Sequence, residues 1–323
     1  MDTSRLRKLG SSDILVSSVA MGCWPIAGVT SLDVTREHSM ETLHAALDAG
    51  INFFDTAYAY GCEGESEQLI GEVTAARRNE VVIATKGGLH RNGKLQEHDA
   101  RPETLRRQCD ESLRRLKTDH VELYYLHAPD PAVPVCDSAG AIRDLIVSGK
   151  VMTAGASNLS IPQLEEFHRI CPLSAVQPHY NMLQRDIESD VLPWCQERGI
   201  SVCVYWPLMK GFLAGRLSRD HQFPEADGRR KYPMFQGEEW QKNQDFLEDL
   251  KLIACEAGLE VSQLVIAWTI QQPGITAALC GAKRKWQITE TARGMQAVLT
   301  AQTLQQIDAA LSRRGKTCSR SAV

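Results

Sequence analysis

The sequence predicts an α/β fold, a closed (β/α)8 TIM barrel with a β-hairpin before its first strand and a long loop after strand 7. Eight short β-rich segments that end in small or polar residues alternate with amphipathic helical patterns. The hydrophobic share of 43% is enough for a full core. Barrels of this kind often reach ~250 residues or more as one unit. We therefore expect residues 1–323 to form a single domain.

The predicted strands and helices follow one another in a regular order. The strands are Ser18–Cys23, then the segments NFFDTA, EVVIATKGG, HVELYYLHAPD, KVMTAGASN, SAVQPHYN and SVCVYWPL, and finally Ile275–Ala282. Helical patterns between them cover Thr35–Ala49, Arg101–Leu116, Ile161–Ile170, Val191–Arg198 and Glu239–Ala257. Repeated β-then-α units with right-handed crossovers favour a closed parallel barrel over an open sheet.

Three segments depart from this repetition. The stretch RLRKLGSSDILVSSV has a Gly-Ser-Ser-Asp turn between two short alternating runs, which predicts a hairpin that closes the bottom of the barrel. Met209 to about Trp240 is rich in Gly, Pro and charge, and is expected to be a long loop over the top that acts as a lid. A further helix is predicted in TAQTLQQIDAALS, beyond the eighth unit.

Composition narrows the classes of partner. The net charge of −4 gives no electrostatic reason to expect nucleic acid or an anionic membrane, so a small molecule is the expected partner. Ten scattered cysteines form no C-x-x-C pair and no Cys/His ligand spacing, so no metal is expected. We find no run of the ~18 to 20 apolar residues that a membrane span needs and no secretory leader. The predicted location is cytoplasmic, and the oligomeric state is left open.

Polar residues stand at the ends of six successive predicted strands. In a barrel of this type these ends form the active face, so the side chains should meet at one mouth. Each has a structural alternative: an Asp can cap the next helix, a Lys can lie on the surface, and a His can sit in the core. The residues are Asp55, Lys86, His127, Ser157, Asn158, Gln177 and Tyr205.

Lys86 is hard to explain as a surface residue. It follows the buried run VVIAT, so it needs a nearby carboxylate to stay charged, and Asp55 is on the neighbouring strand. A tyrosine beside a buried ammonium group would have a lowered pKa and would serve as a proton donor. Tyr60 suits this role better than Tyr58 because it lies beyond the strand, in the loop that crosses the mouth. A neutral His127 would orient the same substrate oxygen.

Seven ordered motifs resemble the signatures of the aldo-keto reductase superfamily. They are DTAYAYG, TKGG, LHAPD, GASN, VQPHYN, YWPL with GFLAGR, and GAKRKWQITE, and they extend from Gly22 to Glu290. The resemblance implies a (β/α)8 barrel that reduces aldehydes or ketones with a nicotinamide cofactor, mostly NADPH, and without a metal. It implies a catalytic tetrad of Asp55, Tyr60, Lys86 and His127, and so selects Tyr60 over Tyr58.

The resemblance also implies a cofactor site. Ser157, Asn158 and Gln177 would bind the nicotinamide carboxamide, Tyr205 would stack on its ring, and the loop Pro207–Arg216 would wrap the pyrophosphate. Lys283, Arg284 and Lys285 begin a helix, where cations oppose the helix dipole unless an anion is bound, so a 2′-phosphate and NADP(H) are favoured over NAD(H). The full predicted set is Gly22, Cys23, Trp24, Asp55, Ser157, Asn158, Gln177, Tyr205, Pro207, Leu208, Lys210, Gly211, Arg216, Gly281, Lys283, Gln287 and Glu290.

The sequence thus predicts an NADPH-dependent carbonyl reductase with Tyr60 as the general acid. One alternative is an NADP-dependent sugar or cyclitol dehydrogenase on the same scaffold. Another is a low-turnover, NADPH-binding redox-sensing subunit. Trp24 and Trp206 either line the substrate pocket or pack the barrel, and Trp206 stands where many family members have a serine. Substrate identity should lie in the loops Gly22–Ala27, Gly87–Ala100, Ala128–Val135 and Met209–Trp240.

Overall fold

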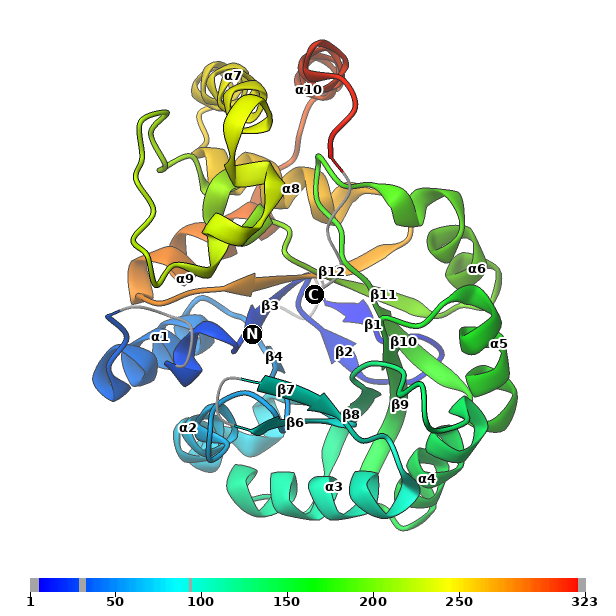
Figure 1. Cartoon of the computed structure of the whole chain (residues 1–323). Coiled ribbons are helices and arrows are strands. Elements are labelled where there is room, and N and C mark those ends of the chain that lie inside the picture. Colours follow the sequence, from blue (N-terminus) through cyan, green and yellow to red (C-terminus); the bar gives the residue numbers. More distant parts are fainter. Residues whose placement is uncertain (1–5, 29–32, 93–94, 319–323) are drawn as a thin grey trace.

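The structure, a computed structural model that describes residues 6–28, 33–92 and 95–318, contains a closed barrel of eight parallel strands. Each strand pairs with the next one around the barrel, and the last pairs with the first (Figure 1). This confirms the predicted TIM barrel. In order of pairing the strands are β3 (Val19–Gly22), β4 (Phe53–Asp55), β5 (Val82–Gly87), β8 (Val121–Leu126), β9 (Val151–Ser157), β10 (Leu173–Gln177), β11 (Ser201–Tyr205) and β12 (Ile275–Gly281).

Helices form a ring outside these strands in Figure 1. Local sequence explains their starts: the Thr35 side chain accepts from the His38 backbone N–H at the start of α1, and Pro102 occupies the first turn of α3. The helices predicted by range are all present, with ends that differ by at most two residues. The helices are α1 (Arg36–Asp48), α2 (Glu65–Thr74), α3 (Pro102–Leu116), α4 (Val135–Val147), α5 (Ile161–Ile170), α6 (Val191–Glu197), α7 (Gly237–Glu256), α8 (Val261–Gln271), α9 (Lys285–Ala292) and α10 (Ala301–Arg314).

The apolar core has two layers, because successive side chains of a strand point to opposite faces. In β8, Tyr124 packs in the layer between strands and helices, and its hydroxyl donates to the Leu105 carbonyl at 3.2 Å. Its neighbour Tyr125 packs inside the barrel with Phe53 and Leu123. The barrel is therefore filled with side chains up to the level of the polar strand ends.

The predicted N-terminal hairpin is present and covers one end of the barrel. Strand β1 (Arg7–Lys8) pairs antiparallel with β2 (Leu15–Val16). Leu9 between them is fully buried among side chains of the barrel interior. Gly10 has φ of +59°, and a Cβ there would lie 2.5 Å from the Ser174 carbonyl oxygen, so the turn requires glycine. The hairpin closes the barrel at the amino ends of its strands.

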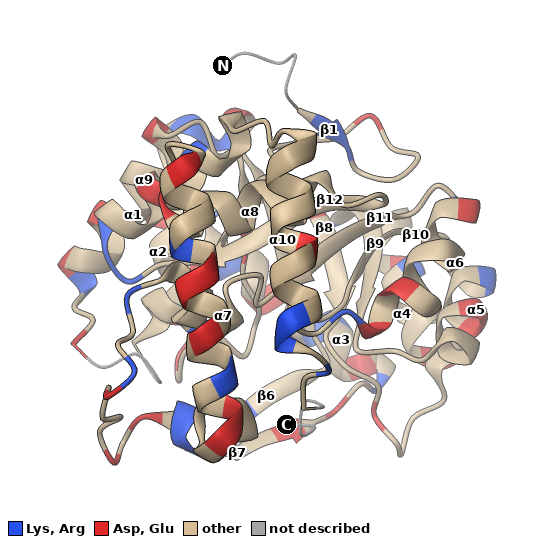
Figure 2. Ribbon diagram, turned by 90° about the horizontal axis from the view of Figure 1, so that it is seen from above, with Lys and Arg blue, Asp and Glu red and all other residues tan. Residues whose placement is uncertain are grey.

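A second hairpin lies at the opposite end (Figure 2). It consists of β6 (Leu89–Asn92) paired antiparallel with β7 (Leu95–His98). We expected Gly87–Ala100 to be a loop, and this expectation was wrong. The Asn92-Gly93 pair, a typical hairpin signal, is the sequence feature that points to it. The hairpin places His90, Arg91 and His98 at the carboxyl ends of the strands.

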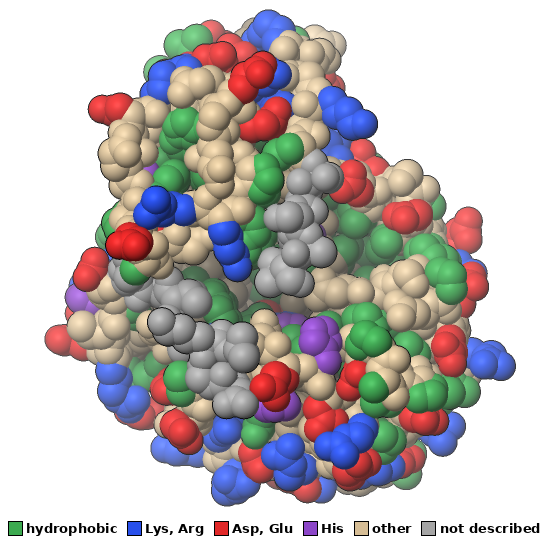
Figure 3. Space-filling model, viewed as in Figure 1, with side chains coloured by type: hydrophobic (Ala, Val, Ile, Leu, Met, Phe, Trp, Pro, Cys, Tyr) green, Lys and Arg blue, Asp and Glu red, His purple; other side chains and the backbone are tan. Residues whose placement is uncertain are grey.

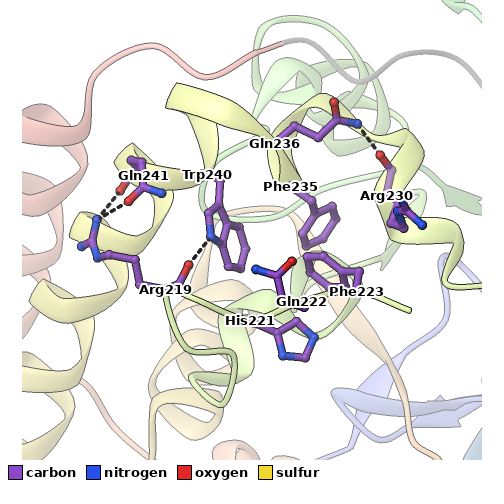
Figure 4. Close-up of a pocket in the computed structure, with 9 residues that line it drawn as sticks. All are labelled: Arg219, His221, Gln222, Phe223, Arg230, Phe235, Gln236, Trp240 and Gln241. Carbon is purple, nitrogen blue, oxygen red and sulfur yellow. Dashed lines mark hydrogen bonds between the residues drawn. The ribbon is translucent and has the colours of Figure 1, made fainter. Parts of the chain in front are cut away.

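The segment after β11 is more ordered than the predicted long loop. It contains the 3₁₀ turns Met209–Ala214, Gly228–Lys231 and Pro233–Phe235 before α7 begins at Gly237. Rings of Phe223, Phe235 and Trp240 contact one another at centroid distances of 5.4 to 6.1 Å. They converge with His221 on a cavity of about 550 Å³ that no predicted catalytic residue lines (Figure 4). The segment thus forms a folded cap with its own aromatic cluster.

The last described residues, up to Cys318, also make defined contacts. The predicted final helix is present as α10, and its Arg314 donates to Asn243 Oδ1 on α7 at 2.8 Å. Beyond it, Thr317 Oγ1 donates to the Leu183 carbonyl at 2.5 Å, in the loop that follows β10. Within the described residues, none of the helices combines the length and the apolar character that crossing a bilayer requires.

Candidate active site

The buried pair of Asp55 and Lys86 lies at the carboxyl ends of β4 and β5. Lys86 Nζ donates to Asp55 Oδ1 at 2.6 Å and to the Thr56 carbonyl at 2.7 Å, and both side chains are almost fully buried. Burial lowers the pKa of Lys86 and raises the pKa of Asp55, and their mutual attraction opposes both shifts. The predicted contact between the two residues is therefore present.

A chain of hydrogen bonds fixes the second oxygen of Asp55. Gln177 Nε2, from the end of β10, donates to Asp55 Oδ2 at 2.7 Å. Ser157 Oγ, from the end of β9, donates to the Gln177 carbonyl at 2.8 Å. Both oxygens of the Asp55 carboxylate are thus satisfied, which locks its orientation toward Lys86.

Asn158 continues this network toward the surface. Its Nδ2 donates to Ser157 Oγ and to the His127 carbonyl, both at 3.0 Å. Its Oδ1 accepts from the Tyr205 hydroxyl at 2.8 Å. Asn158 has φ of +60°, a left-handed conformation that asparagine tolerates better than most residues. The residues predicted to hold the nicotinamide therefore lie together.

Of the two candidate tyrosines, only Tyr60 points at the buried pair. Its ring centroid is 5.0 Å from Lys86 Nζ and 5.8 Å from the His127 ring centroid. Tyr58 instead donates from its hydroxyl to Glu111 Oε2 on α3 at 2.6 Å, and the Arg115 guanidinium lies 4.4 Å from its ring. Tyr60 is thus the tyrosine that lies beside the buried pair, and its role as the proton donor stays a prediction.

The pKa of Tyr60 differs from the expectation. We predicted that Lys86 would lower it, but burial raises the pKa of Tyr60 well above its usual value, and the negative charge of Asp55 adds to the effect. The prediction was wrong because it counted the attraction of the ammonium and neglected both the desolvation of a phenolate and the carboxylate that offsets Lys86. Tyr60 is consequently held in its protonated form, which is the form that donates a proton.

His127 is neutral, as predicted. Burial lowers its pKa well below 6.5, and the charges of Lys86 and His98 act in the same direction. Its Nδ1 is buried and has no hydrogen-bond partner among the described residues. A neutral imidazole beside Tyr60 is available to bind a substrate oxygen.

His127 should make the fold sensitive to acid. Its pKa is depressed in the folded state, so below about pH 6.5 the unfolded chain binds a proton that the folded chain excludes, and stability falls as pH falls. We expect this to cost up to about 1.4 kcal/mol of unfolding free energy per pH unit below that value. Urea unfolding of the wild type and of His127→Gln at pH 7.5 and 5 measures it. Equal acid losses in both proteins would refute the assignment.

Trp24 and Trp206 have different surroundings. The Trp24 ring meets the Tyr60 ring edge-on at a centroid distance of 5.0 Å, so Trp24 borders the site. Trp206 is packed edge-on against His179, Tyr205 and Tyr232 at 5.3 to 5.9 Å. It belongs to an aromatic cluster beside the site. Figure 3 shows this face of the molecule, hollowed near its centre with histidine side chains beside the hollow.

The residues predicted at the first and last strands meet at the seam of the barrel. Gly22 and Gly281 are register partners in β3 and β12. A Cβ on Gly281 would lie 2.9 Å from Pro25 Cγ, so the segment after β3 packs directly against the end of β12. The Cys23 thiol is buried and donates to the Met21 carbonyl.

The loop predicted to wrap a pyrophosphate has an unusual backbone. Met209, Lys210 and Gly211 have φ of +43°, +54° and +90°, while Pro207 is buried and Leu208 partly buried. Successive turns of this kind form concave sites for anions. Arg229, which the sequence prediction missed, donates to the Lys210 carbonyl at 3.5 Å. No sequence signal shows this contact, because it depends on the path of the cap.

The three cations at the start of α9 have different contacts. Lys285 pairs with Glu41 on α1 at 3.4 Å, and Arg284 donates to the carbonyls of Lys283 and Asp33 at 2.9 and 2.7 Å. Lys285 therefore contacts an acid of the protein itself, and the binding of a phosphate by these cations stays a prediction. Lys283 is half-buried, and burial together with the nearby cations Arg229 and Arg284 lowers its pKa. An anion bound here would relieve this repulsion.

The other residues predicted to bind the cofactor near α9 are Arg216, Gln287 and Glu290, and each makes contacts within the protein. Arg216 is ion-paired with Glu290, and Glu290 also accepts from Ser262 Oγ at 2.6 Å. Gln287 Oε1 accepts from the backbone N–H groups of Lys283 and Arg284 at 2.7 and 3.1 Å. Gln287 thus fixes the start of α9 and the position of Lys283.

Comparisons with known proteins show the family. The model of the Aldo/keto reductase family matches residues 18–312. The Aldo-keto reductase YhdN of Bacillus subtilis is 34% identical over 87% of this chain and 85% of its own length, and the Probable aldo-keto reductase 1 of Glycine max is 30% identical over 93% and 87%. The glycerol dehydrogenase AKR11B4 from Gluconobacter oxydans has a similar structure, with a TM-score of 0.90 and 31% identity over 100% of this chain and 99% of that chain. The chain belongs to the aldo/keto reductase family.

Proposed function

We propose that this protein reduces an aldehyde or ketone to an alcohol with NADPH, and that one barrel domain carries the whole activity. Family membership makes it an oxidoreductase with a nicotinamide cofactor and a small-molecule substrate. The observation that carries the proposal is the meeting of Tyr60 and His127 above the buried pair of Asp55 and Lys86. A bound nicotinamide cofactor supplies the hydride for the carbonyl carbon.

The chain's own residues supply the proton and the orientation. The Tyr60 hydroxyl donates its proton to the oxygen on which negative charge develops. The Lys86 ammonium stabilises the phenolate that remains, and Asp55 holds Lys86 in place. Neutral His127 donates a hydrogen bond to the same substrate oxygen and positions it between the two rings. Alcohol oxidation uses the same groups in reverse.

The described residues fit a nicotinamide dinucleotide. Asn158, Ser157 and Gln177 offer amide and hydroxyl groups at the strand ends, and the Tyr205 ring lies beside them. The positive-φ turn at Lys210 and Gly211 suits a pyrophosphate. Lys283, Arg229 and Arg284 lie near one another, with Arg229 paired to Asp227 at 2.7 Å, and these cations suit an additional phosphate, which supports NADP(H) over NAD(H).

The test of the function is oxidation of NADPH in the presence of a panel of aldehydes, ketones and sugars. The proposal predicts cofactor oxidation matched by formation of the corresponding alcohol. Binding of NADPH in a titration, with no turnover of any carbonyl, would contradict it.

Cofactor choice can be tested at Lys283. Lys283→Met should weaken NADPH binding about 10- to 100-fold by removing one charged contact to the phosphate, and should change NADH binding less than threefold. Fluorescence titration of the protein with each cofactor measures both affinities. Lys285→Met is the matched control, since Lys285 pairs with Glu41. Equal losses for NADPH and NADH in Lys283→Met would refute the assignment.

A second candidate function is oxidation of a polyol. The similarity to a structure named as a glycerol dehydrogenase, at 31% identity over the full chain, favours it. Product analysis with NADP⁺ and a panel of polyols distinguishes this function from carbonyl reduction. A polyol dehydrogenase should show the higher kcat/KM for oxidation of a polyol, and a carbonyl reductase for reduction of an aldehyde or ketone.

A further inference from the structure

Arg91 is a cation at the barrel mouth with no ion-pair partner among the described residues. It lies on β6, and its guanidinium carbon is 5.6 Å from the centre of the Trp24 ring. Its Nε is buried and has no hydrogen-bond partner among the described residues. Trp24 in turn meets Tyr60 at 5.0 Å. One indole ring therefore separates an unpaired guanidinium from the proposed proton donor.

A cavity of about 220 Å³ adjoins Arg91. Its walls include Ala59 and Gly61, the two neighbours of Tyr60 in the chain, and also Arg107 and Arg115 from α3. The cavity thus lies against the loop that carries Tyr60. Its size suits a small polar group and exceeds that of a single water molecule.

The other two arginines of this cavity have acidic partners. Arg115 pairs with the buried carboxylate of Glu67 at 3.1 Å. Arg107 pairs with Glu111 at 3.3 Å. Their charges are therefore compensated within the protein, and Arg91 is left as the uncompensated cation.

Asp99, the acid that borders the cavity, is engaged elsewhere. It accepts from Arg101 at 2.7 and 2.8 Å and from Thr104 at 2.8 Å. These contacts hold the pKa of Asp99 well below its usual range, so its charge is permanently balanced by Arg101. It does not neutralise Arg91.

We propose that this cavity is a subsite for an anionic group of the substrate, so that the protein acts on carbonyl compounds that carry a carboxylate or a phosphate. Arg91 would bind the anion through its planar fork, which matches both groups. Trp24 would line the path from the anion to the carbonyl beside Tyr60. The inference rests on the proposed function, whose site it extends.

Paired substrates test this inference. Succinic semialdehyde is compared with butanal, and glyceraldehyde 3-phosphate with glyceraldehyde, so that each pair differs mainly in the anion. We expect the wild type to prefer one or both anionic members. Arg91→Met, which keeps an unbranched side chain without the charge, should lower kcat/KM for the preferred anion about 10- to 100-fold and for its neutral partner less than threefold. Arg91→Lys should recover part of the loss.

Arg106→Met serves as the matched control, since Arg106 lies on the same helix as Arg107 but pairs with Asp144 at 2.7 Å. It should leave both members of each pair unchanged. A carboxylate preference and a phosphate preference are told apart by which pair responds. A wild type that prefers the neutral members, or an Arg91→Met loss that is equal for both, would overturn the subsite while leaving carbonyl reduction intact. Absence of turnover with all four aldehydes would overturn the proposed function, and the subsite with it.

Discussion

Tyr60→Phe is expected to lower kcat/KM for carbonyl reduction by about 10²- to 10⁴-fold, the usual contribution of a positioned general acid. The substitution removes only the hydroxyl, so the contacts of the ring with Trp24 and His127 at 5.0 and 5.8 Å remain. Steady-state kinetics with the best substrate of the panel measures the loss. Binding of NADPH and the unfolding midpoint should stay close to those of the wild type.

Tyr58→Phe is the natural control, two residues away in the same loop. It removes a hydroxyl that donates to Glu111 at 2.6 Å and points toward α3. Because Tyr58 also lines the cavity beside Arg91, the control uses a neutral carbonyl substrate, for which kcat/KM should stay within threefold of the wild type. If Tyr60→Phe kept the wild-type rate while folded, or if Tyr58→Phe showed the larger loss, Tyr60 would not be the proton donor.

The second large effect is expected at Lys86. Lys86→Met leaves the Asp55 carboxylate buried without its cation, which should cost about 3 to 5 kcal/mol of unfolding free energy. The double variant Asp55→Asn with Lys86→Met should regain part of this loss, since no unpaired charge remains. Urea unfolding of the two single variants and the double variant gives the coupling free energy.

Lys242→Met gives the baseline for losing an ion pair at the surface. Lys242 is exposed and pairs with Glu238 at 2.8 Å one helical turn away, so its removal should leave the unfolding free energy close to that of the wild type. A Lys86→Met variant no less stable than Lys242→Met would show that the buried pair is not ionised as we infer. Activity of Lys86→Met should also fall, because the phenolate of Tyr60 loses its counter-charge.

The strand ends were predictable because parallel strands repeat one pattern. Each buried run ends in a polar residue, and the barrel gathers these ends on one face, so the sequence alone predicts that Asp55, Lys86 and Gln177 lie together. Which of these side chains touch one another depends on the register of neighbouring strands. The regular alternation of strands and helices largely fixes this register. The family resemblance then added the roles of these residues, which remain proposals.

The features that the sequence did not predict depend on the path of the loops at the barrel mouth and on how deeply the site is buried. Arg91 was missed because the polar run HRNGKLQEHD lacks the apolar alternation of a strand, although Asn92-Gly93 marks a turn. Arg229 and Lys210 are 19 residues apart in the sequence, so their contact depends on the path that the cap segment takes between them. The pKa of Tyr60 was misjudged because the balance between one cation, one anion and burial needs the actual depth of the site.

The hairpin around Leu9 also has a kinetic consequence. Since it covers the amino end of the barrel with a fully buried leucine, we expect ligands to enter from the opposite face, which holds Tyr60. A cofactor whose nicotinamide lies against Tyr205 and Asn158 would sit beneath a carbonyl compound held by Tyr60 and His127. Binding and release should then be ordered: the cofactor binds before the carbonyl compound, and the alcohol leaves before the oxidised cofactor.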